Sequence, residues 1–456
     1  MYLRRPGEDS PRGNVTRMKT PIAILTLMLA ASATAQRSAI QYTEFDLDNG
    51  LHVILHEDHG TPIVTVSVMY HVGSKNEDPT RRGFAHFFEH LLFEGSQNIG
   101  RGEFSRHVER AGGVLNANTT ADRTYYYEVL PSNQLELGLW LESERMLHAK
   151  VDQKGVDTQR EVVKEERRQR YENQPYGTIL MEVLSRAYST HPYRWPTIGY
   201  MEDLNAASEA DYQAFYKRFY VPNNAVLVVA GDIDPVRTRD LVTRYFGTIP
   251  KGEPVTQPAV EDAGPSAEVR DVIHDRIQLP AVVLGYRIPP TGTSDYYAVD
   301  LVNRLLSSGN SSRLNRALKD EQQKAIATGA FSLPFEQGGL AIMYAIANAG
   351  IEAAPLEQAM TAEVRRIQEQ GVPREEFDKL LAQLEMESVQ DKSRIAGIAS
   401  DLARCHMLLG DTRLVNTEID RYLALGPEDL KRAALTYFRQ DARVVLHYLP
   451  ASQKQP

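Results

Sequence analysis

One segment, residues 250–265, divides this chain into two stretches that each contain strand and helix patterns. The segment is rich in Pro, Glu, Gly and Ala and has no apolar period, which is typical of a linker. The chain has 456 residues, more than one hydrophobic core usually supports. We therefore expect an N-terminal domain over residues 36–249 and a C-terminal domain over residues 266–450, followed by a tail over residues 451–456.

Strand and helix patterns follow a similar order on the two sides of this linker. Runs of β-branched residues bounded by turns predict strands, and apolar residues at helical spacing predict helices. Ala225–Ala230 and Val444–Tyr448 would be the last strands of the two halves, which indicates an internal duplication and an α+β fold. The predicted strands are residues 42–47, 50–56, 63–72, 225–230, 281–286, 340–346 and 443–448, and the predicted helices are residues 82–94, 101–111, 133–149, 155–172, 235–245, 295–306, 355–370 and 375–390.

The N-terminus has the features of a secretory signal peptide. Lys19 precedes an apolar run over residues 21–31, and small residues at 33–35 form a cleavage site before Gln36. The run is too short for a stable transmembrane helix, so we expect removal of residues 1–35 and export across the inner membrane to the periplasm. A retained membrane anchor is the alternative, and translation could start at Met1 or at Met18.

Charge and cysteine content exclude several classes of function. The formal net charge of −9 gives no basic surface of the kind that nucleic-acid binding needs. A single cysteine, Cys405, excludes an intrachain disulfide framework and a cysteine-rich zinc site. Any bound metal must therefore be held by histidines and carboxylates.

A short motif supplies such ligands. His86 and His90 lie four residues apart in a predicted helix, so their imidazoles share one face and can bind one metal ion. Two imidazoles and a carboxylate favour zinc with one position left for water. Glu89 would be the general base that acts on this water. The competing interpretation is an ordinary amphipathic helix with two partly buried histidines. Nine other histidines have no partner at metal spacing and are interpreted as structural or exposed: His52, His56, His59, His71, His107, His148, His274, His406 and His447.

The residues around this motif resemble a known peptidase family. The inverted order H-x-x-E-H is similar to that of the inverzincins, the pitrilysin, insulin-degrading enzyme and mitochondrial processing peptidase family. The resemblance implies two homologous α/β-roll domains, each an antiparallel sheet covered by helices, that form a bowl-like half of a clamshell. It also implies one zinc ion per chain, bound by the N-terminal domain only. The segments that carry the resemblance are residues 83–95, 113–125, 191–199 and 220–233.

The resemblance also implies a third zinc ligand and a substrate-binding strand. The family has a glutamate about 75 residues beyond the second histidine, and Glu165 matches that position. On a helix Glu161 shares the face of Glu165 and would be its outer partner, whereas Glu166 points about 100° away and is the alternative ligand. In the segment over residues 116–119, an edge strand would bind an extended substrate. Its substrate-binding residues would be Asn116, Ala117 and Thr119.

One feature of the family is absent from the second half. Family members that act alone carry an Arg and a Tyr seven residues apart that stabilise the tetrahedral intermediate. Lys319 and Ile326 occupy these places here, and no Tyr lies between Gly309 and Pro334. We therefore expect the chain to resemble the zinc-bearing subunit of a bacterial two-subunit peptidase, with a homologous subunit supplying the Arg/Tyr pair, or to form a homodimer.

The sequence thus predicts a zinc-dependent endopeptidase that degrades or processes peptides in an enclosed chamber. Zinc would activate water, and Glu89 would accept its proton. The alternative is a non-catalytic, peptide-binding or structural subunit of the same family. Such subunits usually lose part of the zinc motif, whereas all of His86, Glu89, His90 and Glu165 are present here.

Overall fold

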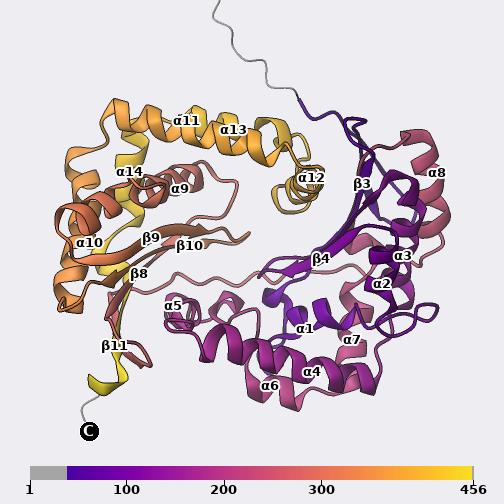
Figure 1. The fold of residues 1–456 in the computed structure, drawn as a ribbon, viewed down its shortest axis with the longest axis horizontal. Coiled ribbons are helices and arrows are strands. Elements are labelled where there is room, and N and C mark those ends of the chain that lie inside the picture. The colour runs from indigo at the N-terminus through magenta and orange to yellow at the C-terminus, as the bar shows by residue number, and fades with distance from the viewer. Residues whose placement is uncertain (1–38, 454–456) are drawn as a thin grey trace, which may run out of the picture. The chain divides into compact units, whose positions relative to one another are not determined.

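The computed structural model describes residues 39–453, and from Ile40 onward the chain forms one compact unit built on two sheets (Figure 1). The predicted signal peptide and its cleavage site lie outside the described residues. Within residues 39–453, the helices are too short or too polar to cross a membrane.

The first sheet has six strands in the order β1-β2-β6-β3-β5-β4. β2 and β6 are parallel, and the other neighbours are antiparallel. β4 forms one edge of the sheet and therefore leaves one side of its backbone unpaired by a strand. The strands are β1 (Thr43–Asp46), β2 (His52–Glu57), β3 (Ile63–Tyr70), β4 (Val114–Thr119), β5 (Thr124–Pro131) and β6 (Ala225–Gly231).

The second sheet has five strands in the order β7-β11-β8-β10-β9, with β7 and β11 parallel. Without β1, the first sheet has the same order and the same parallel pair, which confirms the duplication that the sequence indicated. β6 and β11 are equivalent, as predicted. Each sheet is mixed rather than purely antiparallel. The strands are β7 (Val269–Asp275), β8 (Ala281–Ile288), β9 (Ala325–Leu333), β10 (Gly339–Ala347) and β11 (Arg443–Pro450).

Helices cover both faces of the first sheet. Alternate strand residues, such as Val53 and Leu55, pack under helices of the same half, with Phe87 of α1 and Leu139 of α3 in the same core. The helices in this half are α1 (Phe84–Leu91), α2 (Glu103–Arg110), α3 (Leu135–His148), α4 (Gln153–Arg167), α5 (Ile179–Ala187), α6 (Met201–Ala206), α7 (Glu209–Phe219) and α8 (Pro235–Phe246).

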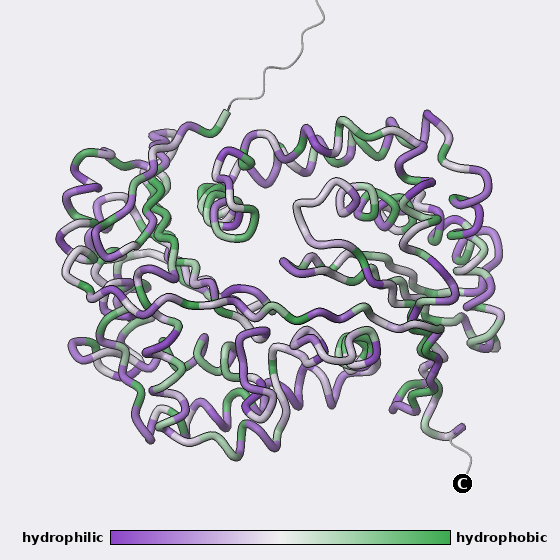
Figure 2. The backbone as a smooth tube through the Cα atoms, turned by 180° about the vertical axis from the view of Figure 1, so that it is seen from behind, coloured by the Kyte–Doolittle hydropathy of each residue, from purple (hydrophilic) through white to green (hydrophobic). Residues whose placement is uncertain are grey.

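The opposite face of the first sheet packs against a helix from the second half. Ile398 and Leu402 of α12 share a core with Ile54, Met69 and Val228. Figure 2 shows hydrophobic colouring in both the strands and this helix. The helices of the second half are α9 (Ser294–Ser307), α10 (Ala353–Gln370), α11 (Arg374–Asp391), α12 (Ile395–Leu409), α13 (Leu414–Leu423) and α14 (Pro427–Tyr437).

The exchange is reciprocal, because α5 of the first half packs on the second sheet. Val183 and Leu184 share a core with Val283 and Leu446. Residues 250–268, between the two sheets, contain no helix or strand. We keep the proposal of a domain boundary in this segment, between two halves that share two cores.

Candidate metal centre

The helix α1 is held in place at its N-terminus by a buried carboxylate. Glu77 accepts hydrogen bonds from the backbone N–H of Gly83 (2.8 Å) and of Ala85 (2.9 Å). Burial raises the pKa of Glu77 to about 8, while these backbone hydrogen bonds oppose the rise. Gly83 has φ 97°, and a Cβ there would lie 2.9 Å from Gly199 Cα, so the sequence needs glycine at the start of the helix.

Aromatic packing fixes the rotation of α1 about its axis. Phe84 and Phe87 stack on Tyr212 of α7, with ring centroids 4.5 Å and 4.4 Å away. Phe88 stacks on Phe215 of the same helix at 5.2 Å. Because these rings occupy one side of α1, the residues on the other side face α4 and β4, which α1 also contacts.

His86 and His90 lie on that other side, next to Glu166 of α4. The Nε2 atoms of His86 and His90 are 3.6 Å and 3.1 Å from Glu166 Oε2. One potential ligand atom of each residue lies within 4.8 Å of the others. The second carboxylate oxygen, Glu166 Oε1, is 2.7 Å from Nη1 of Arg170, which orients the carboxylate and was not identified from the sequence.

The structure places Glu166, the alternative third ligand, next to the two histidines and does not place Glu165 there. The side chain of Glu165 is 53% exposed and contacts Arg168 and Gln169, so it points away from the histidines. Glu161, predicted to be the outer partner of Glu165, is exposed and pairs with Lys164 at 2.9 Å instead. Both residues still line the cavity in front of the histidines.

The protein side chains present fit a zinc ion. Glu166 Oε2, on which the two Nε2 atoms converge, is buried and satisfies no hydrogen-bond criterion with any atom of residues 39–453. Burial, assisted by the charge of His90, lowers the pKa of His86 to about 4. Burial opposes ionisation of Glu166, but contacts with His90, His86 and Arg170 outweigh it and lower the pKa of this carboxyl. A neutral imidazole and an ionised carboxylate are the protonation states that zinc binding requires.

Glu89 lies beside this group without belonging to it. Its Oε2 accepts a hydrogen bond of 2.7 Å from Thr119 Oγ1 at the end of β4. Burial raises the pKa of Glu89, while the hydrogen bond from Thr119 and the charge of His90 oppose the rise. A carboxylate in this environment is suited to accept a proton.

The edge strand β4 lines the same cavity. The cavity has a volume of about 990 Å³ and includes His86, Glu89 and His90 on one wall. The three residues predicted to bind substrate are on β4 and line the cavity: Asn116, Ala117 and Thr119. An extended peptide in the cavity could therefore pair with the free edge of β4.

Comparison with known proteins identifies the family. The model of the insulinase family, peptidase family M16, matches residues 52–200, and the model of the peptidase M16 inactive domain matches residues 206–384. The chain belongs to the M16 peptidase family. The family predicted from the sequence is therefore confirmed, and the candidate metal centre lies within the first match.

Several relatives span most of the chain. A zinc protease of Helicobacter pylori, PqqE, is 29% identical over 444 residues, which are 96% of this chain and 99% of the relative. An uncharacterized zinc protease of Mycobacterium leprae is 28% identical over 306 residues, 66% of this chain and 67% of that protein.

Solved structures agree with the fold. A crystal structure of a protease from Helicobacter pylori matches with a TM-score of 0.86 and 28% identity, over 90% of this chain and all of that one. The first half of the periplasmic protease PqqL from Escherichia coli has a TM-score of 0.73 at 20% identity, over 92% of this chain and 94% of that one. The predicted fold class is confirmed.

Proposed function

We propose that this chain is a zinc-dependent endopeptidase in which His86, His90 and Glu166 bind zinc and Glu89 is the general base. The observation that carries the proposal is the convergence of two Nε2 atoms on one buried carboxylate oxygen, beside a cavity of about 990 Å³. The names of the zinc proteases to which the chain is similar support the same metal and reaction.

The chain's own residues would divide the reaction between them. Bound zinc would act as a Lewis acid towards water and the peptide carbonyl. Glu89 would accept a proton in the attack and return it to the leaving amine, while Thr119 holds its carboxylate in place. The edge of β4 would hold the substrate in extended form beside Glu89, which favours unfolded peptides over folded proteins.

Two neighbouring glutamates provide a direct test of the metal site. We expect Glu166→Ala to weaken zinc binding by more than about 100-fold, the upper end for loss of an outer partner, because it removes a ligand. Glu165→Ala should leave zinc affinity unchanged, because the exposed Glu165 pairs with Arg168 and Gln169 of the π-helical turn after α4. Competition with a chromogenic chelator measures both variants. Loss of zinc from Glu165→Ala but not from Glu166→Ala would restore the original assignment.

We further propose that full activity requires a homologous subunit that supplies an Arg/Tyr pair. Lys319 and Ile326 stand where that pair is expected, and the C-terminal part of the chain matches the inactive domain of the family. Pairing between two copies of this chain is the alternative. We expect the isolated chain to bind zinc but to cleave a pool of unstructured peptides at least tenfold more slowly than a complex with such a subunit. Equal rates would disprove the requirement for a partner.

The proposed setting is the periplasm, after cleavage behind Ala35. The sequence over residues 18–35 supports export. A periplasmic protease of Escherichia coli with the same fold is consistent with this compartment. The N-terminal sequence of the protein purified from cells decides between cleavage and a retained anchor.

A further inference from the structure

A second group of potential metal ligands lies outside the candidate metal centre, where the first sheet meets α12. It consists of Glu44 of β1, His52 of β2 and His406 of α12, each with one ligand atom within 4.8 Å of the others. Within residues 39–453, this group and the His86 group are the two clusters of histidine and carboxylate atoms at metal-binding distances. The M16 chemistry proposed above does not use it.

The Nδ1 atoms of both imidazoles in this group lie at hydrogen-bonding distance from a neighbouring side chain, which leaves the Nε2 atoms for a ligand. His52 Nδ1 lies 2.8 Å from Asp46 Oδ1, and His406 Nδ1 lies 3.1 Å from Thr412 Oγ1. With its proton on Nδ1, each ring has a lone pair on Nε2. The Asp46 carboxylate can only accept, so it places the proton of His52 on Nδ1, and a carboxylate in this position is a usual outer partner of a metal-bound imidazole.

The Nε2 atom of His52 has no hydrogen-bond partner in the part of the chain that the structure describes. His52 Nε2 is buried, and the nearest carboxylate oxygen, Glu44 Oε2, is 3.4 Å away. If Nε2 carries a proton, a buried donor is left unsatisfied, and if it does not, a lone pair faces a carboxylate. Both arrangements are unfavourable, whereas a cation between the two atoms would satisfy them. The nearby cation Arg413 is bound by Asp411 instead.

We propose that Glu44, His52 and His406 form a second site for a divalent transition metal, with zinc as the natural ion for two imidazoles and a carboxylate. The two rings are stacked, with centroids 3.5 Å apart and planes 12° from parallel. Lone pairs that lie in parallel ring planes do not converge, so one ring turns about its Cβ–Cγ bond when the metal binds.

A metal at this site would fasten the two halves of the chain together. Glu44 and His52 belong to the first sheet, whereas His406 belongs to a helix that the second half contributes to that sheet. Without a metal, the contact between the first sheet and the second half includes apolar packing, the stacked rings and two hydrogen bonds between the Asn416 side chain and the backbone of Ile40. Because the ion would bind only the folded chain, it would raise stability in proportion to its concentration.

The test compares metal content between the full mature chain and two single-histidine variants. His406→Phe keeps an aromatic ring for the stack but removes the ligand. His274→Phe removes an exposed histidine on β7 that belongs to neither group. After equilibrium dialysis against zinc, we expect His406→Phe to contain one ion per chain fewer than the wild type, and His274→Phe to equal it. Equal zinc content in all three proteins would overturn the proposal.

Two further measurements keep the test independent of folding defects and of the first site. Glu44→Gln changes an exposed side chain, so it should fold normally and still bind zinc at this site at least tenfold more weakly. In a Glu166→Ala background, the His406→Phe change should again remove one ion. Wild-type affinity in Glu44→Gln, or no loss of an ion in the Glu166→Ala background, would contradict the site.

Discussion

Glu89→Gln is expected to lower kcat by about 10²- to 10⁴-fold, the contribution typical of a general base. The amide has the shape of the carboxylate but does not accept a proton at neutral pH. Thr119 Oγ1, which donates to Glu89 Oε2 at 2.7 Å, can still donate to the oxygen of the amide. Zinc content should stay the same, because Glu89 is not one of the three proposed ligands. Mass spectrometry of a cleaved peptide pool measures turnover.

The matched control for this variant is Glu161→Gln. Glu161 lines the same cavity as Glu89, but it is exposed and pairs with Lys164 on its own helix. We expect Glu161→Gln to turn over peptides as fast as the wild type. Both proteins are measured in the preparation in which the wild type is active, either alone or with a partner subunit. Unimpaired turnover in Glu89→Gln would disprove the assignment of the base, and a defect of similar size in Glu161→Gln would indicate a general effect of cavity charge.

The histidine pair could be predicted because helical spacing alone brings His86 and His90 together. Which glutamate lies next to the histidines depends on which face of α4 is buried, and the sequence is ambiguous there. Val162 and Val163 each predict a buried stripe, three residues before Glu165 and Glu166 respectively. In the structure Val163 is buried and Val162 is 44% exposed, which turns Glu166 towards α1. Packing of α4 against α1 decides which face of α4 is buried, and the apolar pattern of α4 alone does not contain this information.

The same limit applies to the fold. Strands rich in valine, such as β3 and β6, were predicted close to their observed bounds because their runs are apolar and β-branched. β9 was missed because Ala325–Leu333 consists largely of small residues. α5 and α12 were also missed, and each packs on the sheet of the other half. The predicted helix over residues 155–172 ends at Arg167 and continues as a π-helical turn that carries Arg170.

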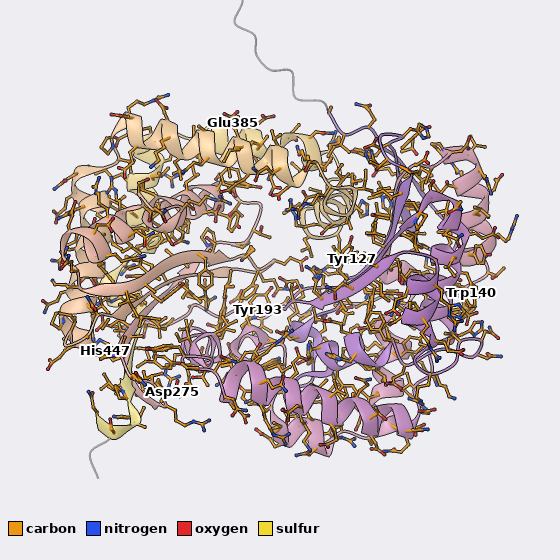
Figure 3. The ribbon with its side chains drawn as sticks, viewed as in Figure 1. Tyr127, Trp140, Tyr193, Asp275, Glu385 and His447 are labelled. Atoms are coloured by element: carbon orange, nitrogen blue, oxygen red, sulfur yellow. The ribbon has the colours of Figure 1, made fainter. Side chains whose placement is uncertain are left out.

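The polar contacts between the halves could not be predicted either, because they join residues far apart in the chain. Lys75 is fully buried, with Nζ 3.0 Å from Asp122 Oδ1 and in contact with Glu336 from the turn between β9 and β10. Tyr193, labelled in Figure 3, donates to the same Asp122 oxygen at 2.5 Å. His71 lies 2.9 Å from Glu336. A buried amine thus balances one carboxylate from each half.

We expect Lys75→Met to lower the free energy of unfolding by about 3–5 kcal/mol, because it leaves the buried Asp122 and the partly buried Glu336 without their cation. Lys150→Met is the control. Lys150 is 55% exposed and 3.6 Å from Asp152, and such surface pairs contribute about 0–1 kcal/mol. Urea unfolding followed by fluorescence measures both variants. A loss below about 1 kcal/mol in Lys75→Met would show that the buried amine does not hold the halves together.

The contact of Lys75 with Glu336 also makes the stability of the chain depend on pH. Burial opposes ionisation of Glu336, but His71 and Lys75 outweigh it and lower its pKa from 4.5 to about 2. A lowered pKa stabilises the folded chain above pH 4.5, and this contribution is lost as pH falls from 4.5 towards 2. Lys75→Met should therefore reduce the loss of stability between pH 4.5 and pH 2.

Adding Asp122→Asn and Glu336→Gln to Lys75→Met should restore part of the lost stability, because neutral side chains do not need the amine as a partner. If Lys75→Met destabilised the chain only through lost packing, these two changes would restore nothing.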